Sequence, residues 1–360
     1  MYAAAAERAD EGFSAMTEAE REAEAERRRQ EVLEVAREIE REAREEAAPE
    51  AARQMARQAR WHRGVARILD FDPKQRGAYH NRLYFVDHAT FDLDEESPLG
   101  PMRYTDRVSK PGEPPYRPCA ALNILSVKIG SSDVGFPIHV YGTVIARDSL
   151  DKKCLYLFRR DRDHCQLINS EDESLILTGP KRGLALITDN YVEIDLKVKD
   201  DRRLDRQLSK GIIRINGVAR RLLDKCEVEI KSLATRLSTV EVMYAVLKRA
   251  VEGTIAIEVL KGDFYGEITA HTTSIKNSLV LYSSKVADAM SGDGNRVIQL
   301  MRPVVSVYLK DMLIIVVRTG DGKYERAIEF TPRVNNGDED QFTVGVIRMR
   351  VKVTWSIMDF

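Results

Sequence analysis

The chain has 360 residues, of which 43% are apolar and 31% are charged, so it has enough apolar material for one large domain or two ordinary ones. Its formal net charge of −1 excludes a strong overall attraction to nucleic acid or to an anionic membrane. No apolar run reaches membrane-spanning length, and the four cysteines form no CxxC pair. We therefore expect a reduced cytoplasmic protein, with the nucleus as the alternative location, and we predict no cofactor, no metal and no membrane contact.

Residues 1 to 70 are predicted to form a charged helical arm. From Thr17 to about Ala48 the sequence is mainly Ala, Glu and Arg without Gly or Pro, a composition that favours helix. Thr17, followed by an acid three residues later, fits a capping box. Pro49 is expected to end this helix, and a second helix is expected to run to about Leu69. The arm either lies exposed in solvent or serves self-association or partner binding.

Residues 71 to 118 are predicted to connect the arm to the rest of the chain. Their first part, residues 79 to 93, is rich in aromatic side chains and is expected to form a short apolar anchor. Residues 94 to 118 hold six of the twelve prolines and are expected to be extended and irregular. We place a domain boundary in this second part.

Residues 119 to 360 are predicted to form an all-β sandwich or barrel-like domain. Apolar residues alternate along several short runs, such as Val240, Val242, Tyr244 and Val246, and turn signals separate the runs. No helix-length period interrupts them convincingly, which favours a sandwich or a barrel. The domain is divided into predicted halves at residues 119–237 and 238–360.

These two halves resemble each other, which predicts an internally duplicated β unit. YGTVIARDSLDKKCLYLF from Tyr141 matches YGEITAHTTSIKNSLVLY from Tyr265 at one constant offset. VEIDLK is matched with VSVYLK, and CEVEI is matched with MRVKV. The acidic residues Asp148 and Asp151 have no acidic counterpart in the second half, so the strand itself does not require them.

A cluster of basic and acidic residues in the first half is the candidate interaction patch. Arg160 and Arg162 are expected to share one strand face, with Asp163 and Cys165 on the other. Strand pairing is expected to bring further charged residues near them: Arg147, Asp148, Asp151, Lys181 and Arg182. The patch is interpreted first as an Arg/Asp network that ties strand ends together, and second as a contact face for an acidic protein partner. Nucleic acid is not favoured because no aromatic platform interleaves with the arginines.

Calcium or small-molecule binding is an alternative of a different class. Hard cations prefer clustered loop oxygens, and the sequence places acids in several predicted turns. These acids are Asp148 and Asp151, then Asp293 and Asp321 in GDG turns, and Asp338, Glu339 and Asp340. Neither an EF-hand loop nor an HExxH motif is present, so we name no metal ligand and no catalytic residue.

Ordered motifs across residues 118 to 358 resemble a grass-expanded plant domain of unknown function. The resemblance rests on HVYGTVIARDSLD, FRRDRDHCQ, LILTGPKR and VEIDLKVK, followed by VVSVYL, IEFTPRV and KVTWSI. It implies a β-rich plant protein and supplies no established catalytic residues. Some relatives of that family are associated with ribosome-inactivating N-glycosidase sequences, which makes this activity an alternative to examine.

The residues give that N-glycosidase alternative little support. The tetrapeptide EAAR, Glu50 to Arg53, matches the E-A-x-R element of such enzymes, but it lies in an Ala/Glu/Arg-rich helix where it arises by chance. Only Tyr2 precedes it, so the tyrosines that stack the target adenine are missing upstream. The leading hypothesis is a non-enzymatic intracellular plant module that binds an unidentified protein, in stress, defence or reproductive regulation.

Overall fold

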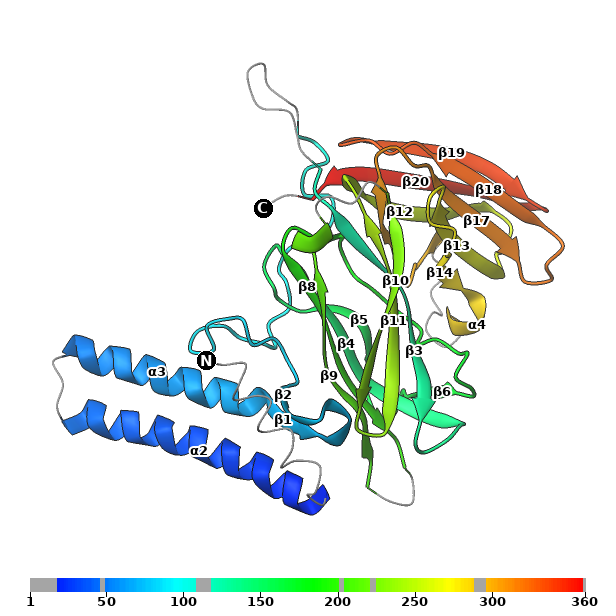
Figure 1. Ribbon diagram of the computed structural model, residues 1–360. Coiled ribbons are helices and arrows are strands. Elements are labelled where there is room, and N and C mark those ends of the chain that lie inside the picture. Colours follow the sequence, from blue (N-terminus) through cyan, green and yellow to red (C-terminus); the bar gives the residue numbers. More distant parts are fainter. Residues whose placement is uncertain are drawn as a thin grey trace.

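The computed structural model describes residues 18–45, 49–107, 118–200, 204–220, 225–287 and 296–358. A helical arm precedes a body of antiparallel sheets, which confirms the predicted fold class (Figure 1). The predicted cap residue Thr17 lies outside the described residues. The first elements are α2 (Glu18–Glu45), α3 (Pro49–Ile68), β1 (Leu69–Asp72), the short 3-10 helix Pro73–Gln75 and β2 (Gly77–His80).

The first half of the body is an open sandwich of two antiparallel sheets. One sheet has the strand order β10-β11-β3-β7, and the other has the order β5-β4-β8-β9, with β6 beside β4. The strands are β3 (Ala121–Ser132), β4 (Ile138–Arg147), β5 (Leu155–Arg160), β6 (Gln166–Ile168), β7 (Leu184–Ala185), β8 (Asp189–Val198), β9 (Arg206–Asn216), β10 (Glu227–Thr235) and β11 (Ser238–Leu247), with a 3-10 turn at Val218–Arg220.

The second half is another open sandwich, and neither half closes into a barrel. Its sheets have the orders β15-β12-β20-β19, with β16 also paired to β12, and β14-β13-β17-β18. Its elements are β12 (Ala250–Lys261), β13 (Gly266–Thr272), β14 (Leu279–Ser283), α4 (Ser284–Ala287), β15 (Val297–Ile298), β16 (Val304–Tyr308), β17 (Leu313–Thr319), β18 (Glu325–Phe330), β19 (Gly337–Val344) and β20 (Ile347–Ile357).

The two sheets of the second sandwich repeat the four-strand orders of the first. The order β5-β4-β8-β9 corresponds to β14-β13-β17-β18, and β10-β11-β3-β7 corresponds to β19-β20-β12-β16. The registers agree as well, because Ala146 pairs with Leu155 and the matched Ala270 pairs with Leu279. Both of these hairpins carry a register shift at the same position. The duplication predicted from the Tyr141 and Tyr265 segments therefore extends to both sheets of each sandwich, apart from the short strands β6 and β15.

Two of the predicted sequence matches are wrong in detail. VEIDLK lies in β8, whose counterpart is β17, whereas VSVYL lies in and just after β16, the counterpart of β7. CEVEI lies at the start of β10, whose counterpart is β19, whereas MRVKV belongs to β20. Strands share an apolar alternation, so short local matches do not identify the partner strand. The pairing of β11 with β3 also places the division between the sandwiches at 248–249, after the predicted boundary at 237/238.

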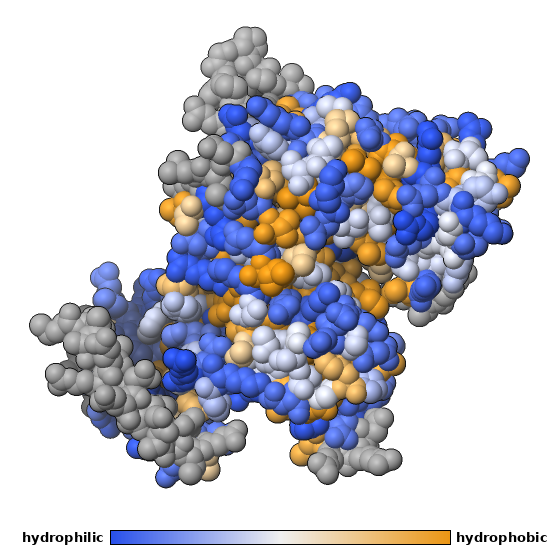
Figure 2. All heavy atoms as spheres, turned by 45° about the vertical axis from the view of Figure 1, so that its right-hand side comes forward, coloured by the Kyte–Doolittle hydropathy of each residue, from blue (hydrophilic) through white to orange (hydrophobic). Residues whose placement is uncertain are grey.

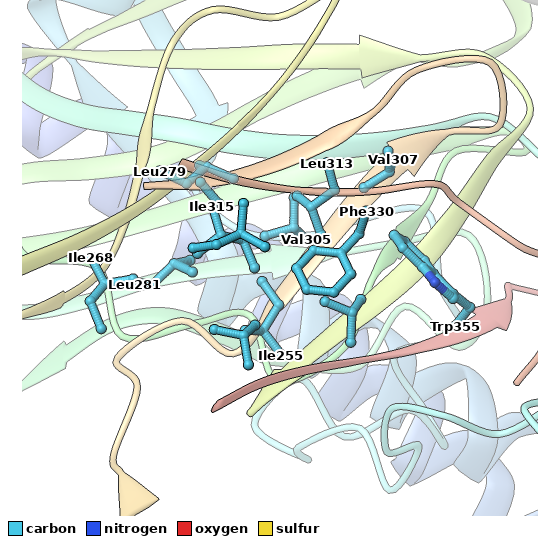
Figure 3. Packing of buried hydrophobic residues seen from close by; sticks show 14 of the residues in the cluster. Ile255, Ile268, Leu279, Leu281, Val305, Val307, Leu313, Ile315, Phe330 and Trp355 are labelled. Atoms are coloured by element: carbon cyan, nitrogen blue, oxygen red, sulfur yellow. The ribbon is translucent and has the colours of Figure 1, made fainter. Parts of the chain in front are cut away.

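Each sandwich has its own apolar core, and the two cores meet along one junction. Figure 3 shows the second core, where Trp355 of β20 is fully buried among aliphatic side chains. Leu125, Ala245 and Leu247 come from strands of the first sandwich but pack in this second core. On the face shown in Figure 2, hydrophobic atoms are densest in the middle, between the two sandwiches. Apolar packing therefore joins the two units directly.

The arm is an antiparallel pair of helices that projects from the body (Figure 1). Ala36 of α2 and Ala59 of α3 are fully buried where the helices meet, and such small side chains permit a close approach. Arg29 donates from Nε and Nη2 to the carbonyl oxygen of Leu69, at 2.9 and 2.7 Å. This contact fixes α2 to the first strand after the arm.

The β1-β2 hairpin fastens the arm to the first sandwich. Arg236, between β10 and β11, pairs with Asp70 at 2.6 Å, and its backbone N–H donates to Asp72 at 2.5 Å. The Tyr79 hydroxyl donates to the carbonyl oxygen of Lys210 at 2.6 Å. Burial acts to raise the pKa of Asp70, but hydrogen bonds from the guanidinium and from a neighbouring amide outweigh it, and the pKa is lowered.

Two equivalent glycines provide a test of the duplication. A Cβ on Gly142 would lie 2.1 Å from the carbonyl oxygen of Asp195, and one on Gly266 would lie 2.1 Å from that of Arg318. We expect alanine at either position to lower the free energy of unfolding by about 1–3 kcal/mol in urea denaturation. Gly100→Ala is the control, because its Cβ would meet no atom within 4 Å. Unchanged stability in both strand variants would contradict the close approach.

Candidate functional site

Arg147, at the end of β4, lies in a buried ion pair. Its guanidinium is fully buried and donates to both carboxylate oxygens of Glu193 on β8, at 2.7 and 2.9 Å. The same guanidinium donates to the carbonyl oxygens of Lys152 and Leu93, at 2.9 and 2.5 Å. Bidentate pairing and carbonyl acceptors satisfy the buried charge. The pair therefore links the loop after β4, strand β8 and the chain near Leu93.

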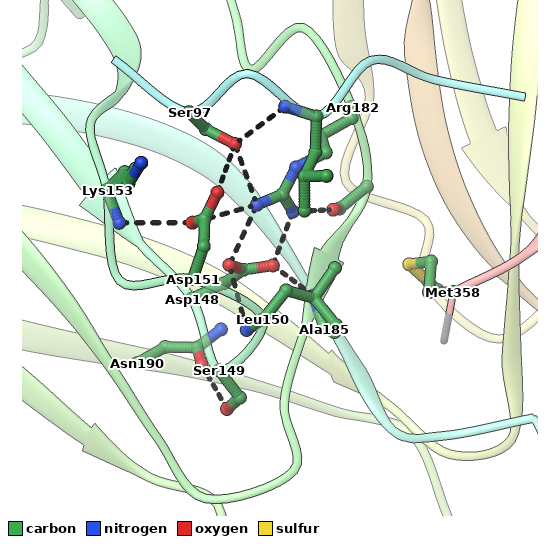
Figure 4. A network of polar contacts seen from close by, with 12 residues as sticks. Ser97, Asp148, Ser149, Leu150, Asp151, Lys153, Arg182, Ala185, Asn190 and Met358 are labelled. Carbon is green, nitrogen blue, oxygen red and sulfur yellow. Dashed lines mark hydrogen bonds and ion pairs between the residues drawn. The ribbon is translucent and has the colours of Figure 1, made fainter. Parts of the chain in front are cut away.

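Arg182, just before β7, forms a second buried pair with Asp148 (Figure 4). Its two terminal nitrogens lie 2.5 and 3.0 Å from the Asp148 carboxylate, and the two side chains are 1% and 0% exposed. The guanidinium also donates to Ser97 at 3.3 Å and to Asp151 at 3.4 Å. Ser97 in turn donates to Asp151 at 2.5 Å. We call these six residues the ionic clamp: Ser97, Arg147, Asp148, Asp151, Arg182 and Glu193.

The ionic clamp holds the segment 81–107, which we call the strap. The strap crosses the first sandwich, where the backbone N–H of Leu83 donates to Glu193 at 2.8 Å. It then reaches the second sandwich, where the N–H of Met102 donates to Glu252 of β12 at 2.7 Å. The Glu252 carboxylate also accepts from the backbone N–H of Gly183 at 2.6 Å. The strap therefore connects the two sandwiches through buried carboxylates and is not a free linker.

The aromatic part of the strap differs from the predicted apolar anchor. Leu83 is fully buried, whereas Tyr84 and Phe85 are 39% and 47% exposed. The Tyr84 ring stacks on His80 with 4.6 Å between ring centroids. Leu83 and the buried ion pairs therefore anchor this segment, and the Phe85 ring adds a contact with Tyr191, at 6.3 Å between ring centroids.

The Asp148 carboxylate of the ionic clamp is fully occupied by hydrogen-bond donors. Asp148 accepts from both nitrogens of Arg182 and from the backbone N–H groups of Leu150 and Ala185, at 3.2 and 3.0 Å. Four donors occupy the lone-pair positions of a carboxylate. Burial raises the pKa of the neighbouring Cys154 thiol, so this group stays protonated at neutral pH. The clamp is chemically suited to holding chain segments together.

The acids predicted to form calcium-binding turns do not gather in one place. Asp338, Glu339 and Asp340 lie within strand β19, not in a turn. Asp321 lies in an exposed turn, where it accepts from Thr319 and from the backbone N–H of Lys323, and Asp293 lies outside the described residues. Across the described ranges there is no group of three or more His, Cys, Asp or Glu side chains suited to a metal ion.

The predicted interaction patch divides into two separate groups. Arg160 pairs with Gly142 on β4, five residues before Arg147, which corresponds to about 16 Å along the strand. β5 ends at Arg160, so Arg162 and Asp163 lie in a turn, and the prediction that they occupy opposite strand faces is wrong. The Asp161 carboxylate stabilises this turn by accepting the backbone N–H groups of the two residues that follow Arg162.

The second of these groups centres on Asp205. Arg162 donates to its carboxylate at 2.7 and 3.3 Å, and the Tyr141 hydroxyl donates at 2.7 Å. The Arg162 hydrogen bond holds the pKa of Asp205 well below its usual range, and burial together with this carboxylate raises the pKa of Tyr141 to about 12.

Lys181 is partly exposed and pairs with Glu96 of the strap at 2.8 Å.

Sequence reasoning missed Glu193, Ser97 and Glu252, which complete the buried contacts. Glu193 lies on β8 between Val192 and Ile194, so its side chain points to the opposite face of the sheet from theirs. A charged side chain on the face opposite the apolar one normally faces water. The strap covers that face, so Glu193 is only 4% exposed. No local signal predicts this burial, because the covering segment lies about a hundred residues earlier.

Two surface hollows have volumes of about 290 and 220 Å³ and contain no residue of the ionic clamp. The larger lies between the β3–β4 connection and the end of β8, near His139 and Lys199, and the smaller lies over β13, β14 and β17. Both are below the usual size range of ligand pockets. Among the described helices, none combines the length and the apolar character needed to cross a membrane.

The fold and the clamp define a class of protein: two copies of an antiparallel β-sandwich, joined by a clamped strap and preceded by a helical arm. The model of the family "Domain of unknown function (DUF6598)" matches residues 121–353, which is well over half of the chain. The chain therefore belongs to this family. The matched region begins and ends within the two sandwiches and excludes the arm and the strap.

The chain also shows a weak likeness to solved structures of human GIVD cytosolic phospholipase A2. The match to the enzyme alone has a TM-score of 0.23 and 11% sequence identity. It covers 68% of this chain and 31% of the phospholipase chain. The matches to its complexes with methyl gamma-linolenyl fluorophosphonate, with and without terbium chloride, both have a TM-score of 0.21 and 8% sequence identity. Both cover 67% of this chain and 32% of the phospholipase chain. The chain thus spans about a third of their length, and likeness at this level assigns no activity. Among curated proteins, none matches the chain.

The buried pair and its exposed neighbour give a direct test of the clamp. We expect Asp148→Asn or Arg182→Met to lower the free energy of unfolding by about 3–5 kcal/mol, because each leaves a buried partner uncompensated. Lys181→Met is the matched control and should cost less than about 1 kcal/mol, since its pair with Glu96 is solvent-exposed. Equal effects at positions 181 and 182, measured by chemical denaturation, would refute the structural role.

Proposed function

We propose that the protein is a non-enzymatic binding module in which the two sandwiches form a rigid scaffold and the helical arm contacts a protein partner. The observation that carries this proposal is the arm itself, which projects from the body and contributes no residue to either apolar core (Figure 1). Trp61 of α3 is 39% exposed although its ring lies edge-on near His88 of the strap, and the adjacent Arg57 and Arg60 are exposed. Tryptophan and arginine are the residue types most enriched at binding hot spots.

The scaffold supports this proposal by fixing the base of the arm. Arg29 and the β1-β2 hairpin fasten the arm to the first sandwich, and Arg57 of α3 pairs with Asp87 of the strap at 2.5 Å. A Cβ on Gly64 would lie 2.5 Å from Cβ of His88, so the strap also lies directly against α3. A pre-positioned arm loses little conformational freedom when it binds a partner.

The biological setting of this proposal rests on sequence resemblance. The motifs HVYGTVIARDSLD and LILTGPKR resemble a grass-expanded plant family, which favours an intracellular plant protein in stress, defence or reproductive regulation. We place it in the cytoplasm, with the nucleus as the alternative. Its partner is a protein, and nucleic acid is not favoured.

Removing the arm tests the proposed function. A chain that starts at Leu69 keeps both apolar cores, so we expect its thermal unfolding to remain cooperative. Affinity capture from the native plant tissue should lose the proteins that the full chain recovers. The full chain carrying Arg326→Glu on exposed strand β18 is the control and should recover them. Identical recovery by the shortened chain would contradict a role for the arm.

The N-glycosidase alternative is tested by adenine release from ribosomes. Glu50 and Arg53 of the EAAR element are both exposed, on the first turns of α3. Such a site lacks the enclosure that excludes water and orients a substrate. We expect no adenine release. Robust release that Glu50→Gln abolishes would replace the binding proposal with this activity.

A further inference from the structure

The strap covers the outer face of the sheet β5-β4-β8-β9 in the first sandwich. Glu193 of β8 is only 4% exposed beneath it, and its carboxylate accepts from Nε of Arg82 at 3.0 Å and from the backbone N–H of Leu83 at 2.8 Å. Just before β5, the backbone N–H of Cys154 donates to the carbonyl oxygen of Glu95 at 2.9 Å. Two positions of this sheet, one on β8 and one at the start of β5, therefore bind the strap.

The second sandwich has an equivalent face, on the sheet β14-β13-β17-β18. Glu193 pairs with Ile145 in the first sheet. Its equivalent is Val316 of β17, which pairs with Thr269 at the matching position of β13. The carboxylate that binds the strap is thus replaced by an aliphatic side chain. The face keeps its place in the fold but has a different chemistry.

A hollow of about 220 Å³ lies on this equivalent face. Ser278, which comes just before β14, corresponds to Cys154, which comes just before β5. Ser278 and Val316 both line the hollow, so it contains the equivalents of both strap-binding positions. The full lining consists of Glu267, Thr269, Ser278, Val280, Val316 and Arg318. The site where the strap lies on the first sandwich is thus open on the second.

Apolar side chains remain accessible around the hollow. One row across the sheet, paired in register, consists of Val280, Thr269, Val316 and Ala327. Val280 is 38% exposed, Ala327 is exposed, and the two central members are half-buried. Ile145, the equivalent of Thr269, is only 6% exposed in the first sandwich. Covering the row removes apolar surface from water, which favours binding.

The rim of the hollow carries a negative charge that no described residue neutralises. Arg318 pairs with Glu325 of β18 at 2.6 Å, which balances the charge of both groups. Glu267 forms no ion pair with a described residue. Glu267 and Thr269 are two residues apart on one strand face, so their Cα atoms are about 7 Å apart. The site thus complements a cation placed next to an aliphatic side chain.

We propose that this face of the second sandwich binds an extended segment of another protein that carries a cation next to a large aliphatic side chain. The aliphatic side chain fills the hollow over Val316, and the cation pairs with Glu267. Arg82 and Leu83 of the strap are such a pair, and they contact the equivalent face of the first sandwich. Duplication therefore gives the chain two related faces, of which the strap occupies the first and a partner the second.

This inference goes beyond the proposed function, because it concerns a different part of the molecule. The sheet β14-β13-β17-β18 lies on the far side of the body from the arm (Figure 1). The arm and this face are separate surfaces, so each is tested without changing the other.

The probe is a fluorescein-labelled peptide HNRLYFV, which has the sequence of residues 80–86 of the strap. We expect its fluorescence anisotropy to rise saturably with the concentration of the full chain. Glu267→Lys should weaken this binding about tenfold, because attraction to the peptide cation becomes repulsion. Val280→Lys should also weaken it, since a charge then replaces part of the apolar row.

Matched controls separate this site from non-specific attraction. Glu339→Lys makes the same charge reversal on β19 of the opposite sheet, where the side chain is exposed, and it should leave binding unchanged. The charge-reversed peptide HNELYFV should bind wild type about tenfold more weakly and should regain affinity for the Glu267→Lys chain. Circular dichroism verifies that each variant keeps its strands.

Two results would overturn the proposal. The first is no saturable binding up to about 0.1 mM wild-type chain, or equal binding by wild type and Glu267→Lys. The second is a wild type of twice the 40.9 kDa chain mass in sedimentation velocity that Glu267→Lys reduces to the single mass, because a second copy would then be the occupant. All variants keep the arm, so loss of peptide binding leaves the proposed function intact. If arm removal leaves partner capture unchanged, the proposed function falls and the peptide result still stands.

Discussion

The arrangement of the molecule depends on two buried bidentate ion pairs, Arg147–Glu193 and Arg182–Asp148. An isolated buried charge is strongly unfavourable, so each pair is stable only when its partners and the surrounding carbonyl and N–H groups are in place. The strap supplies some of those surrounding groups, at Leu83, Leu93 and Ser97. The ion pairs thereby fix where the strap lies, and the strap fixes how the arm leaves the first sandwich.

The duplicated sandwiches show which features belong to the fold and which were added to it. Both units have the same strand order and the same hairpin register. The position of Asp148 is occupied by Thr272 in the second unit, whose hydroxyl donates to Asp311 at 3.0 Å. A neutral hydroxyl suits this position because its partner is a carboxylate and not a guanidinium. The ionic clamp is thus specific to the unit that carries the strap and the arm.

The sequence predicts the parts of this structure that depend on local pattern. Alternation along Val240 to Val246 predicts a strand, Pro49 predicts the second helix, and the constant offset between Tyr141 and Tyr265 predicts the duplication. It fails where burial is decided by distant chain segments. Glu193 and Arg147 have the appearance of surface residues until the strap covers them. Arg160 and Arg182 belong to one predicted patch, but strand direction places them at different ends of the sheet.

The clearest test of this account is hydrogen–deuterium exchange along the strap of the wild-type chain. The backbone N–H of Leu83 donates to Glu193, and that of Ser97 donates to the carbonyl oxygen of Cys154 at 3.0 Å. If the buried ion pairs hold the strap, these two amides should exchange as slowly as amides within strand β4, although they lie outside any regular strand. Exchange at the rate of an open loop would show that the strap is not clamped and would contradict the account.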